Sequence, residues 1–152
     1  MTPMTLIIQP RNLRTLSWKN FQRVRRPKEA GADASTAHKI SCSGTIVTLT
    51  LDTANTWVIQ GRTSDALLKH EQGHWDIYVM KAEEINRAIQ GSPGNTFKAK
   101  FEEISQKYDG IDRQYDEETD HSRNENKQEE WNCKIASAKR NHNLDLSVVC
   151  DQ

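Results

Sequence analysis

The chain has 152 residues and a mass of 17.4 kDa, which fits one domain over residues 1–152 and excludes two large ones. It contains 21 lysines and arginines and 21 aspartates and glutamates, so the zero net charge gives no general reason to expect nucleic acid or an anionic membrane as a partner. Hydrophobic residues make up only 35% of the chain, which predicts a modest core.

The first part of the chain, up to about residue 61, is rich in strand-forming residues. Segments that are β-branched or alternate in polarity predict strands at 6–9, 16–18, 39–51 and 56–60. Residues 25–36 predict a loop, and residues 52–55 predict a hairpin turn between the last two strands. We therefore expect a small antiparallel sheet in this half.

The second part of the chain is helical in pattern. Ser64 and Asp65 can cap a long helix that runs to about residue 90, with Gly91 placed to end it. Residues 92–95 predict a tight connection, so the next helix should return antiparallel to the first. That helix is expected from about 96 to 108 or 115, a third helix over 126–139 and a last strand over 144–150. The fold class predicted is α+β.

Neither the N-terminal segment nor the cysteines determine the cellular compartment of the protein. No stretch approaches the length of a membrane span, and the apolar run within residues 1–10 is too short for a signal peptide, so we expect a cytosolic protein or a mature form. Cys42, Cys133 and Cys150 are an odd number. Free thiols are the first expectation, and a disulfide between Cys133 and Cys150 is the main alternative.

The residues that indicate chemistry are His70-Glu71-Gln72-Gly73-His74, an HExxH motif inside the longest predicted helix. Positions i and i+4 share a helix face, so both imidazoles can bind one zinc ion while Glu71 flanks it as a general base. The alternative is two ordinary surface histidines and a solvated carboxylate. The mid-helix position favours the metal site.

A catalytic zinc ion needs a third protein ligand. The metzincin pattern is excluded because Met80 stands where its third histidine would be and Ile77 where its glycine would be. Several residues remain open as the third ligand on spacing alone: Glu102, Glu103, Glu117, Glu118 and His121.

The segment from Leu67 to Ile77, followed by Tyr115, Thr119, His121, Gln128 and Trp131, resembles a bacterial family of predicted secreted zinc-dependent proteases, first catalogued as domain of unknown function 922. This resemblance implies a zincin-like fold, a peptide or protein substrate, and a periplasmic or secreted protein. It also favours His121 over the glutamates as third ligand, and it implies that Gln128 supports a metal-binding histidine.

The expected reaction is metal-assisted hydrolysis. His70, His74 and His121 would hold Zn²⁺, whose bound water has a lowered pKa, and Glu71 would take the proton of that water and pass it to the leaving amine. Tyr115 is the candidate donor to the oxyanion, with a packing role as the alternative.

Two other function classes remain open. The chain could be an interaction module that keeps the zincin scaffold and its metal without hydrolysis. A weaker alternative is nucleic-acid binding through residues 1–28, which hold seven basic residues and no acidic one, although a solvated surface is the simpler interpretation. His38 and His142 are expected to be exposed or capping residues rather than ligands.

Overall fold

The computed structural model describes residues 6–91 and 95–150, so residues 1–5 of the N-terminal segment and residues 92–94 of the predicted connection lie outside it. Strands come first and α-helices last, which confirms the α+β class. The strands are β1 (Leu6–Gln9), β2 (Gln22–Val24), β3 (Ala34–Ser35), β4 (His38–Ser43), β5 (Ile46–Leu51) and β6 (Trp57–Ile59). The helices are α1 (Asp65–Gly91), α2 (Asn95–Thr119) and α3 (Glu125–Asn141), with short 3-10 helices η1 (Trp18–Asn20) and η2 (Thr53–Asn55).

The strands form two small mixed sheets, in the orders β1-β5-β4 and β2-β6-β3. The expected antiparallel sheet is therefore wrong in part, because β1 pairs with β5 and β2 pairs with β6 in parallel. The parallel partners are far apart in sequence, whereas β4 and β5 are joined by a two-residue hairpin turn in which Gly44 takes a φ of +60°.

Several sequence predictions fail where the chain changes sheets. The expected strand over 39–51 is two strands, β4 and β5, joined by a turn at Gly44. The hairpin expected at 52–55, between this strand and the strand at 56–60, does not form. Residues 52–55 contain η2 and connect β5 of one sheet to β6 of the other. Residues 16–18 form no strand, and neither do residues 144–150.

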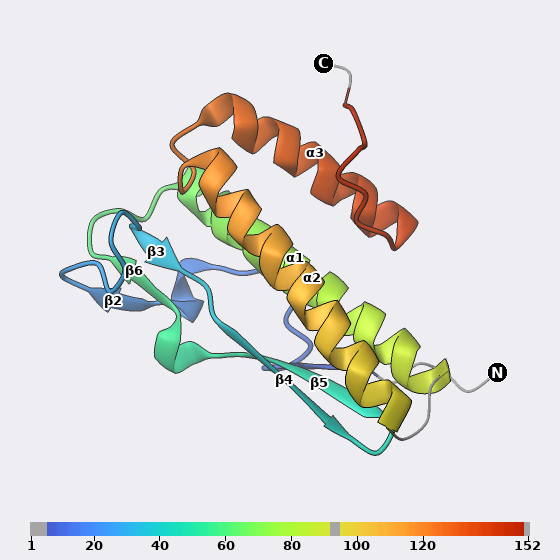
Figure 1. Cartoon of the computed structure of the whole chain (residues 1–152). Helices are drawn as coiled ribbons and strands as arrows, with labels where there is room; N and C mark the ends of the chain where they lie inside the picture. Colours follow the sequence, from blue (N-terminus) through green and yellow to red (C-terminus); the bar gives the residue numbers. More distant parts are fainter. Residues whose placement is uncertain (1–5, 92–94, 151–152) are drawn as a thin grey trace.

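Helix α1 is the centre of the molecule. It begins where the sequence predicts, with Ser64 Oγ accepting a hydrogen bond from the backbone N–H of Leu67, and it ends at Gly91. Helices α1 and α2 lie side by side and run in opposite directions, with both sheets on one side and α3 on the other (Figure 1). The core between α1 and β5 includes Val47 and Leu49, both fully buried. No helix among residues 6–91 and 95–150 is long and apolar enough to cross a membrane.

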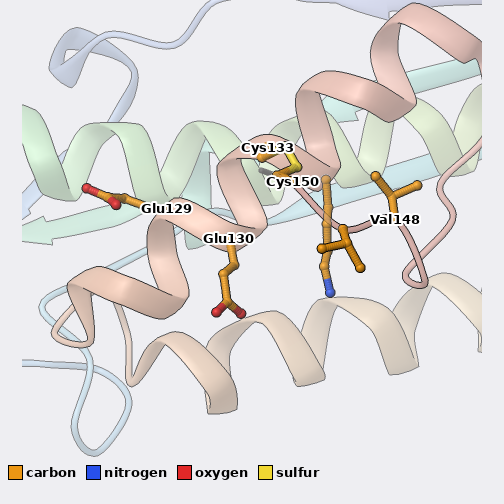
Figure 2. A pocket seen from close by; sticks show the side chains of 7 residues that line it. Glu129, Glu130, Cys133, Val148 and Cys150 are labelled. Atoms are coloured by element: carbon orange, nitrogen blue, oxygen red, sulfur yellow. A yellow bond between two sulfur atoms is a disulfide. The ribbon is translucent and has the colours of Figure 1, made fainter. Parts of the chain in front are cut away.

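The C-terminal segment is held on α3 by a disulfide between Cys133 and Cys150, whose Cα atoms are 6.2 Å apart. The first expectation, three free thiols, is wrong for this pair, and Cys42 is the free cysteine. A cavity of about 670 Å³ lies beside the disulfide, lined by Glu129, Glu130 and the tail residue Val148 among others (Figure 2). This cavity lies apart from the histidines of α1.

Candidate metal centre

The two histidines of the HExxH motif lie on one buried face of α1. His70 is 1% exposed and His74 is 5% exposed, and their ring centroids are 4.9 Å apart. Each residue of the group His70, Glu71 and His74 offers a ligand atom, and these atoms lie within 4.8 Å of one another. This group could hold a metal ion.

The Nδ1 atom of each histidine is fixed by an acceptor from another helix. His70 Nδ1 lies 2.8 Å from Gln128 Oε1 on α3, and His74 Nδ1 lies 2.6 Å from Asp112 Oδ1 on α2. Since both partners are acceptors, a neutral imidazole at either position carries its proton on Nδ1 and its lone pair on Nε2. Such partners of metal-binding histidines set the ring orientation and the tautomer. The contact implied for Gln128 is confirmed.

Glu71 is buried beside the histidines, with an exposure of 1%. The hydroxyl of Thr36, which follows β3, donates a hydrogen bond of 2.7 Å to Glu71 Oε1. Glu71 Oε2 lies 3.9 Å from His70 Nε2. One carboxylate oxygen is thus held by Thr36, and the other faces the histidine nitrogens.

The Nε2 atoms of both histidines point to one residue that the motif did not indicate, Asp116 on α2. Asp116 Oδ1 lies 3.0 Å from His70 Nε2 and 2.9 Å from His74 Nε2. His121 also reaches this oxygen, with its Nδ1 at 3.4 Å. The structure therefore brings together all three histidines of the predicted ligand set, and it adds a carboxylate between them.

The glutamates considered as third ligands lie elsewhere. Glu118 accepts a hydrogen bond of 3.0 Å from Trp131 Nε1, so its carboxylate is engaged with α3. Glu102, Glu103 and Glu117 are exposed on α2. The geometry favours Asp116 and His121 over these glutamates.

Tyr115 lies directly beneath the motif and is fully buried. Its hydroxyl donates to the backbone carbonyl of His70 at 2.8 Å and accepts from Gln128 Nε2 at 2.9 Å. The ring occupies the space that a side chain at Gly73 would need, since a Cβ there would lie 2.6 Å from Tyr115 Cζ. Because the hydroxyl is committed to His70, this geometry favours a positioning role for Tyr115 over the expected role as oxyanion donor.

The neighbouring groups of the site shift the pKa values of His74 and Asp116. Burial lowers the pKa of His74, but the carboxylates of Asp112, Asp116 and Glu71 outweigh burial and raise it well above the ordinary value. Burial raises the pKa of Asp116, yet hydrogen bonds to His70 and His74 lower it far below the ordinary value. The site thus keeps Asp116 ionised and draws positive charge toward the histidines.

The remaining histidines take no part in this cluster. His38 stacks on Tyr78 with ring centroids 3.8 Å apart, and its Nε2 lies 3.0 Å from Lys81 Nζ. Burial and the charge of Lys81 lower the pKa of His38 to about 4. His142 ends α3 in a left-handed conformation, which confirms its expected capping position.

Residues 45–122 match the family model described as bacterial protein of unknown function (DUF922). The match covers just over half of the chain and includes α1, α2 and His121. The chain belongs to the DUF922 family. No curated protein and no solved structure matches it.

The cluster of this DUF922 protein fits a divalent cation. It combines two Nε2 lone pairs with the carboxylates of Asp116 and Glu71, and nitrogen and oxygen donors of this kind suit zinc. Asp112 adds a further negative charge behind His74. These carboxylates concentrate negative charge around imidazoles that are almost fully buried, and a bound cation would balance it.

The sequence motif did not indicate Asp112, Asp116 or Thr36. Asp112 and Asp116 are four residues apart on α2, so they share a helix face, and this i, i+4 pair opposite the HExxH pair was the available signal. Thr36 had no such signal, because it lies in a segment that the sequence predicts as a loop.

Proposed function

We propose that this DUF922 protein is a zinc-dependent hydrolase, and specifically a peptidase with a zincin-like active site. His70, His74 and His121 are the histidines that would hold the ion, and Glu71 is the general base. The observation that carries this proposal is the buried His70–Glu71–His74 group, in which another helix supplies an acceptor for each Nδ1. The resemblance to predicted secreted proteases supports a peptide substrate and a periplasmic or secreted location.

The bound zinc ion would supply Lewis acidity and lower the pKa of a water molecule to about 7. The protein's own residues would transfer the proton and orient the histidines. Thr36 donates to Glu71 Oε1, which leaves Oε2 as the oxygen that accepts the proton of the water and returns it to the leaving amine. Gln128 and Asp112 keep the Nε2 lone pairs of the histidines directed toward the ion.

A cavity beside the histidines gives the substrate a place to approach. It has a volume of about 210 Å³ and is lined by Thr36, His74, Tyr78 and Asp116 among others. The strand β3, at the edge of its sheet, contributes Ala34 and Ser35 to the same cavity. An extended peptide segment would therefore meet Glu71 from the side of β3.

The test is the Glu71→Gln variant, compared with the wild type for metal content and for cleavage of a diverse peptide library. We expect about one zinc ion per chain in both proteins and a loss of hydrolysis of about 10²- to 10⁴-fold in the variant. Glu83→Gln is the matched control, because it makes the same change about three turns further along α1 and should keep full activity. Full activity in Glu71→Gln would rule out this mechanism.

The second candidate is a zinc-binding interaction module without hydrolysis. The small volume of the site cavity, about 210 Å³, favours it, since larger substrates need a longer cleft. Full zinc occupancy together with no cleavage of any peptide in the library would support this candidate over the peptidase.

A further inference from the structure

One oxygen atom, Asp116 Oδ1, lies at the meeting point of three imidazoles. Its distances are 3.0 Å to His70 Nε2, 2.9 Å to His74 Nε2 and 3.4 Å to His121 Nδ1. Ligand atoms around a tetrahedral zinc ion, with bonds of about 2.0 to 2.3 Å, are separated by roughly 3.3 to 3.7 Å. The separation from His121 lies within this range, and the separations from His70 and His74 are hydrogen-bond lengths a few tenths of an ångström shorter, so a small outward shift of Asp116 would place the three atoms around one ion.

The hydrogen-bond partners of the two imidazoles also favour a metal ion next to Asp116. His70 and His74 each direct Nδ1 at an acceptor, and the orientation of the Gln128 amide is fixed because its NH₂ group donates to Tyr115 and to Asn132. In the neutral state, therefore, both Nε2 lone pairs face a carboxylate oxygen, which also carries lone pairs. A cation among these three atoms turns this repulsion into attraction.

Asp116 and His121 differ in how the backbone holds them. Asp116 lies within α2, one turn after Asp112, so the helix fixes its position. His121 lies beyond the end of α2 in a turn where Asp120, His121 and Ser122 all have positive φ, at 49°, 51° and 83°. Such a run is unusual for residues with side chains, and it makes the position of His121 depend on the turn.

We propose that Asp116 is the third protein ligand of the metal and that His121 is an outer donor whose loss leaves the ion bound. This inference rests on the metal site of the proposed function and deepens it. It revises the ligand set of the proposed function, because Asp116 takes the place in that set for which the resemblance to the protease family favours His121.

The experiment compares zinc affinity across variants of the full chain, measured by competition with a chromophoric chelator after removal of bound metal. Asp116→Ala and Asp116→Asn should weaken zinc binding at least about 100-fold, the upper end of what outer-shell changes cost. His121→Ala should weaken it less than tenfold. Glu117→Gln, which removes a negative charge from the next, exposed position, should leave the affinity unchanged.

Substitution with Co²⁺ supplies a readout that is independent of activity. The visible absorption of the Co²⁺ protein should change strongly in Asp116→Asn and only slightly in His121→Ala. Asp116→Asn has nearly the same shape as the wild type, so it decides the matter if Asp116→Ala does not fold.

Wild-type affinity in Asp116→Asn, or an equal loss of affinity in His121→Ala, would overturn the inference. A wild-type protein that binds no zinc would overturn both this inference and the proposed function. Zinc binding that depends on Asp116 without any hydrolysis would contradict the peptidase alone.

Discussion

Helix α1 has buried residues both at 70–74, toward its site end, and at 82–86, toward its far end, but different forces hold the two stretches. At the site end, the buried groups are polar, and His70, Glu71 and His74 each bond to a side chain from another element. At the far end, Ala82 and Ile85 are fully buried among apolar residues. There the buried Asn86 leaves its Oδ1 without a partner among the described residues.

The site end of α1 thus fixes the orientation of the site residues, whereas the far end mainly stabilises the fold. A buried polar group is costly unless it is paired, so the site end is fixed in one arrangement by its hydrogen bonds. Apolar packing is non-directional, and it supplies free energy of folding without fixing ring orientations. Substitutions at the two ends should therefore damage different properties.

The largest effect is expected at Gly73, where Gly73→Ala places a Cβ 2.6 Å from Tyr115 Cζ. Tyr115 must move, and it holds both the carbonyl of His70 and the amide of Gln128. We expect the free energy of unfolding to fall by about 3 kcal/mol and zinc binding to be lost. Urea unfolding and metal titration measure the two effects.

Gly110→Ala is the matched control, because a Cβ on this helical glycine of α2 meets nothing within 4 Å. Helix propensity predicts a gain of about 0.5 to 1 kcal/mol and no change in zinc affinity. Equal behaviour of the two alanine variants would show that Tyr115 can move away without disturbing the site.

The second prediction concerns the far end of α1. Ile85 is fully buried, so Ile85→Ala should cost about 3 kcal/mol of folding free energy, and Ile85→Val about 1 kcal/mol. The folded fraction of each variant should bind zinc with wild-type affinity, because no contact of the histidines involves this position. Parallel urea unfolding and zinc titration would test this separation, and a zinc affinity that falls with the stability would contradict it.

The elements that the sequence predicted best are those with local causes. The bounds of α1 follow from Ser64 as cap, from an apolar pattern without proline and from Gly91 at the end. The HExxH motif needs nothing beyond one helix. The parallel pairing of β1 with β5 and of β2 with β6 could not be predicted, since it depends on how long connections return to the sheet.

The site shows the same limit. His70, Glu71 and His74 were predicted from one turn of helix, whereas Asp116 and Thr36 join them only through tertiary packing. The disulfide is a similar case, because the wide spacing of the cysteines favoured free thiols and gave the Cys133–Cys150 pair only as the alternative. A local pattern predicted the three residues of the motif, and the packing of α2 and β3 against α1 supplies Asp116 and Thr36, which contact them.

The smallest effect is expected at Thr36, whose hydroxyl is the partner of Glu71 Oε1. Thr36→Val keeps the shape of the side chain and removes the donor, so Glu71 would lose the bond that orients its carboxylate. We expect hydrolysis to fall about tenfold and stability to fall by about 1 to 2 kcal/mol, because Glu71 remains buried with one bond fewer. Steady-state kinetics with a peptide substrate would measure the first effect.

Thr36→Ser restores the hydroxyl while removing the methyl group, and this separates positioning from packing. If the hydrogen bond to Glu71 is what matters, Ser should recover most of kcat, while its loss of a buried methyl group costs stability of about 1 kcal/mol. Activity would then follow the hydroxyl, and stability would follow both the hydroxyl and the methyl group. A serine variant as slow as the valine variant would mean that Thr36 acts at the site end by packing, as Ile85 does at the far end.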